Sequence, residues 1–177
     1  MSITKRLLLA VAAALWSVAA YAAYPERPIT IVVGFPAGGS TDVVARLLGQ
    51  ELSERLGKTV VIGNMPGATG KIASMNVMRA APDDHRLLMT AAGPHGTMPA
   101  LAASISYDPV KDFTPVVSVA EVPNVIIVNP QFPASTLQEL IAIARKSPGK
   151  LNYGSTSPGS SAHMGGELLK KMATSPS

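Results

Sequence analysis

The feature that most constrains this chain is an apolar run that leads through a glycine-rich turn into a helix start. Residues 29–34 are apolar enough to predict a strand buried on both faces of a parallel sheet, and Gly38 and Gly39 follow it directly. The first turn of a helix carries N–H groups without intrahelical acceptors and partial positive charge. We interpret residues 35–42, the glycine corner, as a site for a carboxylate or phosphate. A purely structural turn is the alternative.

The same strand, turn and helix arrangement recurs twice in the next 50 residues. The predicted strands are residues 59–62 and 87–90, the turns are residues 66–70 and 91–96, and the helices are residues 43–56, 71–80 and one after residue 96. Residues 43–56 carry an apolar stripe that is predicted to pack on the sheet, and Ser40 or Asp42 can cap this helix. The pattern predicts a doubly wound α/β sheet, in which ligands bind beyond the carboxyl ends of the strands.

The pattern changes near residues 102–110, where we place a domain boundary. Three strands and two helices are predicted beyond it, namely strands at residues 113–119, 124–128 and 151–154, and helices at residues 136–145 and 162–172. Thr136 and Glu139 have the spacing of a capping box. Residues 155–160, which we call the serine turn, lead into the last helix as a counterpart of the glycine corner.

The N-terminus has the pattern of an export signal. Lys5 and Arg6 precede an apolar run over residues 7–20, which is shorter than the roughly 20 residues of a spanning helix. Residues 20–22, Ala-Tyr-Ala, are typical of a cleavage site. We predict a signal peptide over residues 1–22, a first α/β domain over 23–105 and a partial second α/β domain over 106–177. An uncleaved N-terminal anchor is the alternative.

Charge and cysteine content exclude several classes of protein. Without Lys5 and Arg6, 13 of the 15 basic residues remain against 11 acidic ones, and they form no basic stripe. Nucleic acid is therefore not an expected partner. The chain has no cysteine, so an exported form depends on its hydrophobic core rather than on disulfides.

Cofactor and catalytic motifs are incomplete. A phosphate-binding loop around residues 67–71 fails because Met65 and Ile72 stand where glycine and a hydroxyl residue are needed, and the glycines near residue 38 lack dinucleotide-binding spacing. A secreted serine hydrolase remains an alternative, although its nucleophile motif is missing. Its candidate residues are Ser40 or Ser160, His95 or His163, and Asp42. His85, His95 and His163 lack metal-ligand spacing. We expect no cofactor, no metal and no catalysis.

Several motifs in one register resemble the extracytoplasmic solute receptors of tripartite tricarboxylate transporters, the Bug or TctC-type family. They are residues 24–29 (Tyr-Pro-Glu-Arg-Pro-Ile), 35–42 (Phe-Pro-Ala-Gly-Gly-Ser-Thr-Asp), 66–70 (Pro-Gly-Ala-Thr-Gly), 107–109 (Tyr-Asp-Pro), 112–113 (Asp-Phe), 148–155 (Pro-Gly-Lys-Leu-Asn-Tyr-Gly-Ser) and 164–168 (Met-Gly-Gly-Glu-Leu). The resemblance implies a monomeric periplasmic binding protein with two doubly wound α/β domains around a Venus-flytrap cleft. Such a receptor captures a small carboxylate and delivers it to a membrane transporter.

The resemblance also implies a binding site between the glycine corner and the serine turn, with the carboxylate held largely by backbone amides and waters. The implied ligand-binding residues are Phe35, Ala37, Gly38, Gly39, Ser40, Asp42, Ser155, Thr156, Ser157, Gly159, Ser160 and His163. Asp42 is expected to cap its helix rather than to face a ligand carboxylate, because two carboxylates repel.

Length and two loops depart from the family pattern. Members have roughly 300 residues, so the second domain and the return to the first are expected to be incomplete, as in a truncated product. We expect such a chain to be poorly stable and to bind weakly or not at all, because sheet edges and apolar faces stay uncovered. A non-functional remnant is therefore a further alternative. Residues 63–67 (Gly-Asn-Met-Pro-Gly) and 83–85 (Asp-Asp-His) also differ from the family's usual loops.

Overall fold

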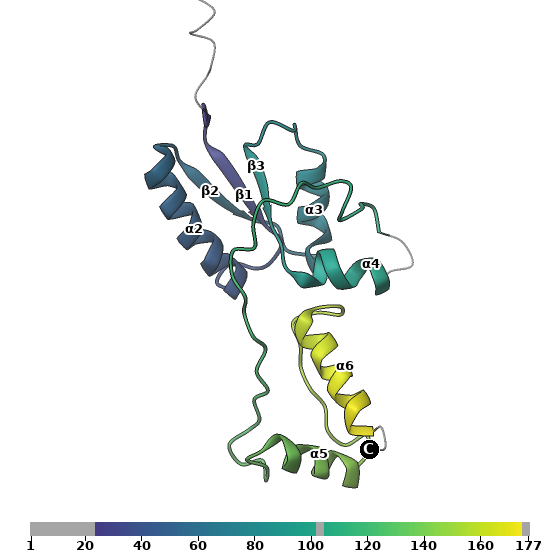
Figure 1. The fold of residues 1–177 in the computed structure, drawn as a ribbon. Helices are drawn as coiled ribbons and strands as arrows, with labels where there is room; N and C mark the ends of the chain where they lie inside the picture. The colour runs from purple at the N-terminus through teal and green to yellow at the C-terminus, as the bar shows by residue number, and fades with distance from the viewer. Residues whose placement is uncertain (1–23, 102–104, 175–177) are drawn as a thin grey trace, which may run out of the picture.

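The computed structural model describes residues 24–101 and 105–174 (Figure 1), so the predicted signal peptide lies outside the described residues. The first unit consists of β1 (Ile29–Val33), α2 (Ser40–Leu56), β2 (Val60–Asn64), a 3-10 turn η1 (Ala68–Gly70), α3 (Lys71–Met78), β3 (Arg86–Met89), a π-helical turn η2 (Gly93–Thr97) and α4 (Met98–Leu101). These bounds confirm the three predicted strand, turn and helix units.

The three strands form a parallel sheet in the order β2-β1-β3, with β1 in the centre. Ile31 is paired with Ile62 on one side and with Leu87 on the other. The connection through α2 leads to one side of β1, and the connection through α3 crosses back to the other side. Right-handed crossovers in opposite directions place α2 and α3 on opposite faces of the sheet, as Figure 1 shows.

The core lies between the sheet and α2, where Ile31, Val33 and Ala45 are buried. Small residues bring this helix close to the sheet, because a Cβ at Gly49 would lie 2.9 Å from Ile62 Cδ1. The predicted apolar stripe is wrong in part, since Val43 and Leu47 are 48% and 65% exposed. The packed face instead contains Ala45, Leu48, Gly49 and Leu52, which recur at helical spacing.

Two helices follow in the second part of the chain, α5 (Leu137–Lys146) and α6 (Ser161–Thr174). The capping box is confirmed: Glu139 N–H donates to Thr136 Oγ1, and the Glu139 side chain accepts from Thr136 N–H. Within the described residues no helix is long and apolar enough to cross a membrane.

The three strands predicted beyond residue 112 are wrong, because residues 113–119, 124–128 and 151–154 belong to no strand in this structure. Their residue types favour strands, but a strand also needs a hydrogen-bonded neighbour. No backbone hydrogen bond of residues 113–128 is found within the described part of the chain. Val116, Val125 and Ile127 are consequently 78–87% exposed.

Candidate ligand-binding site

The site is organised by the carboxyl ends of the three parallel strands, where the glycine corner follows β1, η1 follows β2 and η2 follows β3. The chain leaves β1 toward β2, whereas β3 lies on the other side of β1. Sheets of this type bind ligands in the crevice beside the central strand, at the point where the connections diverge. In this topology, the glycine corner and the turns beside it lie at the expected ligand-binding position.

The glycine corner is exposed and has free hydrogen-bond donors. Residues 36–40 are exposed, and Gly39, the N-cap of α2, has extended backbone angles of φ −74° and ψ 166° without a side-chain cap. The predicted capping by Ser40 or Asp42 is therefore wrong. Among the described residues, the N–H groups of Ser40, Thr41 and Asp42 have no acceptor. Three free amides at the positive end of a 17-residue helix can bind an anion.

The buried carboxylate of Asp42 stabilises the glycine corner by accepting hydrogen bonds. Asp42 is 2% exposed, and its Oδ2 accepts from Gly38 N–H at 2.8 Å and from Arg46 Nε at 2.9 Å. Its Oδ1 accepts from Asn64 Nδ2 at 2.9 Å. The Arg46 guanidinium, the Gly38 amide and the Asn64 amide hold the pKa of Asp42 well below its usual value. Asp42 thus shapes the exposed corner without facing outward from it.

The serine turn has an exposed half and a buried half. Ser155 and Thr156 are exposed, Ser157 is half-buried, and Gly159 and Ser160 are buried. Ser160 Oγ accepts from His163 N–H at 3.2 Å, which caps α6. His163 Nδ1 accepts from Gly159 N–H at 3.2 Å. Ser160 and His163 therefore hold the turn in shape, whereas the hydroxyls of Ser155 and Thr156 are accessible.

Glycines let the turns at this edge of the sheet approach one another. A Cβ at Gly34 would lie 3.0 Å from Gly70 Cα, and a Cβ at Gly70 would lie 2.7 Å from Pro94 Cγ. The serine turn joins this group, because a Cβ at Gly93 would lie 3.3 Å from Gly159 O. The serine turn therefore contacts the turn after β3, and Thr69 joins it to the turn after β2. None of the contacts found in the described residues joins it directly to the glycine corner.

A polar and aromatic cluster holds the turn after β3 in place. His95 Nε2 donates to Ser74 Oγ at 3.1 Å, since the Ser74 hydroxyl itself donates to Gly70 O. The His95 ring packs against Tyr107 and Phe113, and Tyr107 OH donates to Pro94 O at 2.6 Å. Sequence reasoning did not identify this cluster. Its only signal was a histidine within a turn of small residues.

Because His95 is partly buried in this cluster, we expect the stability of the chain to depend on pH. Burial lowers the pKa of His95, so the unfolded chain takes up a proton at a higher pH than the folded chain. Stability is therefore lost as the pH falls below the ordinary histidine pKa of about 6.5. We expect His95→Gln, which retains a donor for Ser74, to weaken this loss. Urea unfolding midpoints of the wild type and of His95→Gln at pH 7.5 and 5.5 measure this loss of stability. If the midpoint fell equally in the two proteins, the role of His95 would be contradicted.

The residues named for a hydrolase are engaged in other contacts. His95 is bonded to Ser74, His163 Nδ1 accepts a backbone amide, and Asp42 is paired with Arg46. Among the described residues, neither the Ser40 nor the Ser160 hydroxyl is bonded to a histidine ring. The same part of the chain contains no group of three or more acidic or histidine residues that could hold a metal.

Comparisons with known proteins agree with the motifs in the sequence. Residues 44–175 match the sequence profile described as the tripartite tricarboxylate transporter family receptor. The chain belongs to this receptor family. BugT of Bordetella pertussis, a relative, is 38% identical over 148 residues, which are 83% of this chain and 45% of BugT. A UPF0065 protein of Agrobacterium vitis, from the TAR-I ttuE-ttuC' intergenic region, is 37% identical over 155 residues, which are 88% of this chain and 44% of that protein.

Solved structures of similar receptors share the fold. A Rhodopseudomonas palustris protein solved with adipate has a TM-score of 0.81 and 39% identity, covering 85% of this chain and 50% of that one. MatC from the same species, solved with bound malate, has a TM-score of 0.77 and 37% identity, covering 86% and 52%. The chain therefore spans about half the length of the receptors it matches.

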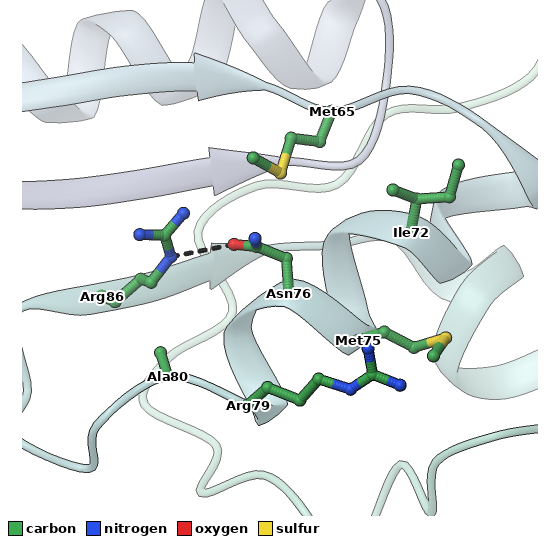
Figure 2. A pocket seen from close by; sticks show the side chains of 7 residues that line it. All are labelled: Met65, Ile72, Met75, Asn76, Arg79, Ala80 and Arg86. Carbon is green, nitrogen blue, oxygen red and sulfur yellow. Dashed lines mark hydrogen bonds between the residues drawn. The ribbon is translucent and has the colours of Figure 1, made fainter.

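A hollow in this receptor chain lies away from the glycine corner, on the face of the sheet beside α3 (Figure 2). Its volume is about 640 Å³, and its lining residues are Met65, Ile72, Met75, Asn76, Arg79, Ala80 and Arg86. Arg86 Nε donates to Asn76 Oδ1 at 2.9 Å, as the dashed line shows. None of the predicted ligand-binding residues lines it.

Proposed function

We propose that this chain is part of a periplasmic receptor that binds a small carboxylate and delivers it to a membrane transporter of the tripartite tricarboxylate type. The observation that carries the proposal is the exposed glycine corner, where three N–H groups of the first turn of α2 lack acceptors. The family and the two ligand-bound neighbours, one with adipate and one with malate, support a carboxylate as the ligand.

The proposed ligand contacts are divided between two groups of residues. Phe35, Ala37, Gly38, Gly39 and Ser40 line the first surface, on which the free amides of the first turn of α2 are the donors, and Ser155, Thr156 and Ser157 supply hydroxyls from the serine turn. The other predicted site residues, Asp42, Gly159, Ser160 and His163, act by holding the two turns in shape. This arrangement binds a ligand without any group that forms or breaks a covalent bond.

Periplasmic location and receptor activity are consistent with the solved relatives, one of which is described as a periplasmic transporter structure and another as the periplasmic binding protein BugD. We propose that residues 1–22 direct export and are then removed. The receptor is proposed to act as a monomer that meets the transporter subunits in the periplasm.

The free amides allow a sharp test at Ser40, the first residue of α2. Proline is favoured at the first helical position and lacks an N–H group, and the extended backbone of Gly39 is compatible with a following proline. Ser40→Pro therefore removes one amide donor and leaves the helix intact. The matched control is Ser40→Ala, which removes only the hydroxyl.

NMR titration with malate and adipate detects both weak and tight binding. We expect the amide signals of residues 38–42 to shift on titration, with the uncharged diamide adipamide as a control ligand. One hydrogen bond to a charged group changes affinity by about tenfold or more, so Ser40→Pro is expected to bind at least that much more weakly than Ser40→Ala. The proposal is wrong if neither carboxylate moves these signals, or if the two variants bind equally.

A further inference from the structure

The serine turn is attached to the first unit by a side chain that is distant in sequence. Thr69 Oγ1 donates to Pro158 O at 3.1 Å and lies 3.4 Å from Ser157 Oγ, across 89 and 88 residues of sequence. Thr69 is half-buried, and both of its partners belong to the turn that leads into α6. Figure 1 shows this turn beneath α4, at the edge of the first unit.

The backbone of Thr69 is unusual for its residue type. Its angles are φ 53° and ψ 43°, in the left-handed region that β-branched residues rarely adopt. Glycine would fit this conformation without strain, as Gly70 does in the next position with φ 83°. Strain of this kind persists where the surrounding structure requires a particular side chain. Here, that requirement is a hydroxyl donor facing the carbonyl of Pro158.

Glycines on both sides of this contact let the serine turn approach the first unit closely. A Cβ at Gly93 would lie 3.3 Å from Gly159 O and 3.5 Å from Ser160 Cα. A Cβ at Gly159 would lie 2.7 Å from Met98 Sδ, and Gly159 itself has φ 79°. The serine turn is therefore packed closely onto η2 and α4, and Thr69 adds a directed hydrogen bond to this packing.

We propose that Thr69 is a positioning residue that fixes the serine turn on the first unit and thereby slows the release of a bound carboxylate. This role rests on the proposed function, because the serine turn supplies one of the two ligand surfaces. Thr69 acts through Pro158 and Ser157, and it needs no contact with the ligand itself. Loss of its hydroxyl leaves the glycine corner complete but lets the opposite surface move away from the ligand.

Matched variants isolate the hydroxyl. Thr69→Val keeps the branched shape and the backbone strain but removes the donor, whereas Thr69→Ser keeps the donor. We expect malate to dissociate about fivefold faster from Thr69→Val than from the wild type, the effect of one ordinary hydrogen bond, and at nearly the wild-type rate from Thr69→Ser. Dissociation rates come from NMR line shapes during titration. Equal rates for Val and Ser would overturn the role of Thr69.

A second measurement needs no ligand, because the chain has no cysteine of its own. The γ oxygens of Thr69 and Ser157 lie 3.4 Å apart, so Thr69→Cys combined with Ser157→Cys is expected to form a disulfide on mild oxidation. The control pair is Thr69→Cys with Ser155→Cys, and thiol titration measures both. The contact between Thr69 and the serine turn would be contradicted if Thr69→Cys with Ser157→Cys did not cross-link, or if both pairs cross-linked equally. If the pair cross-links but the wild type binds no malate, the proposed function fails, and the role in release fails with it.

Discussion

Replacing Gly70 by alanine is expected to lower the free energy of unfolding by about 3 kcal/mol, through left-handed backbone strain and overpacking together. Gly70 has φ 83°, and an added Cβ would lie 2.7 Å from Pro94 Cγ. The proline ring is rigid and buried, so it cannot turn aside as a flexible side chain would. The turns after β2 and β3 would have to separate, and His95 and Ser74 would be displaced with them.

A matched control separates the two contributions. Gly38 has φ 81°, but no atom lies within 4 Å of a Cβ added there. Gly38→Ala therefore carries only the backbone cost, about 1 kcal/mol. Urea unfolding of the two variants measures the difference, which we attribute to the contact with Pro94. Equal losses of stability would show that the turns can separate at little cost.

Asp42→Ala is expected to weaken malate binding by about 30-fold. Without the carboxylate, the amide of Gly38 and the side chains of Arg46 and Asn64 lose their common acceptor, and the exposed corner becomes mobile. Each backbone residue that must be ordered again on binding costs at least about 1 kcal/mol. Ordering Gly38 and Gly39 again on binding therefore costs about 2 kcal/mol, which corresponds to the expected 30-fold loss of affinity for malate. NMR titration of the variant measures it.

The matched control for Asp42 is Glu51→Ala in the same helix. Glu51 also accepts from an arginine four residues later, at 2.7 Å from Arg55 Nε, but that pair is exposed. Exposed pairs contribute little, so malate affinity and stability should hardly change. If Glu51→Ala and Asp42→Ala weakened binding equally, a general effect on α2 would explain the result better than the loss of a supported corner.

The pH dependence of the Asp42 effect follows from its lowered pKa. A carboxyl whose pKa is lower in the folded state contributes stability above its unfolded pKa of about 3.9, and this contribution disappears as the pH falls through the folded value. The difference in unfolding free energy between the wild type and Asp42→Ala should therefore be constant at neutral pH and shrink below about pH 4. Urea unfolding at several pH values tests this, and a difference that grew in acid would contradict it.

Local features were predictable because they depend on neighbouring residues. The apolar run of β1, the predicted helix end at residue 56 and the capping box at Thr136 all involve interactions within a few residues. All three are present in the structure, and Gly57 follows α2 in the left-handed conformation with φ 63°. The strands predicted over residues 113–128 were wrong for the complementary reason. Their valines and isoleucines favour extended backbone, but pairing depends on a neighbouring strand that no local pattern reports.

The site was predictable only in outline. Its exposed corner follows from a glycine pair between an apolar run and a helix, and the family motifs indicate a carboxylate ligand. The inward orientation of Asp42 did not follow, because it depends on Asn64, which is 22 residues away. The cluster of His95 with Tyr107 and Phe113 was missed for the same reason.

The three strand, turn and helix units of the first half, the capping box of α5 and membership of the receptor family follow from the sequence, whereas the cap predicted for α2 and the strands predicted beyond residue 112 are wrong. Only the tertiary structure decided which glycines must lack a side chain, which residues hold the glycine corner, and where the serine turn is attached. The reason is physical: the contacts of Gly70 with Pro94 and of Thr69 with Pro158 join segments 24 and 89 residues apart. Such contacts exist only once parallel strands have brought their carboxyl ends to one edge of the sheet.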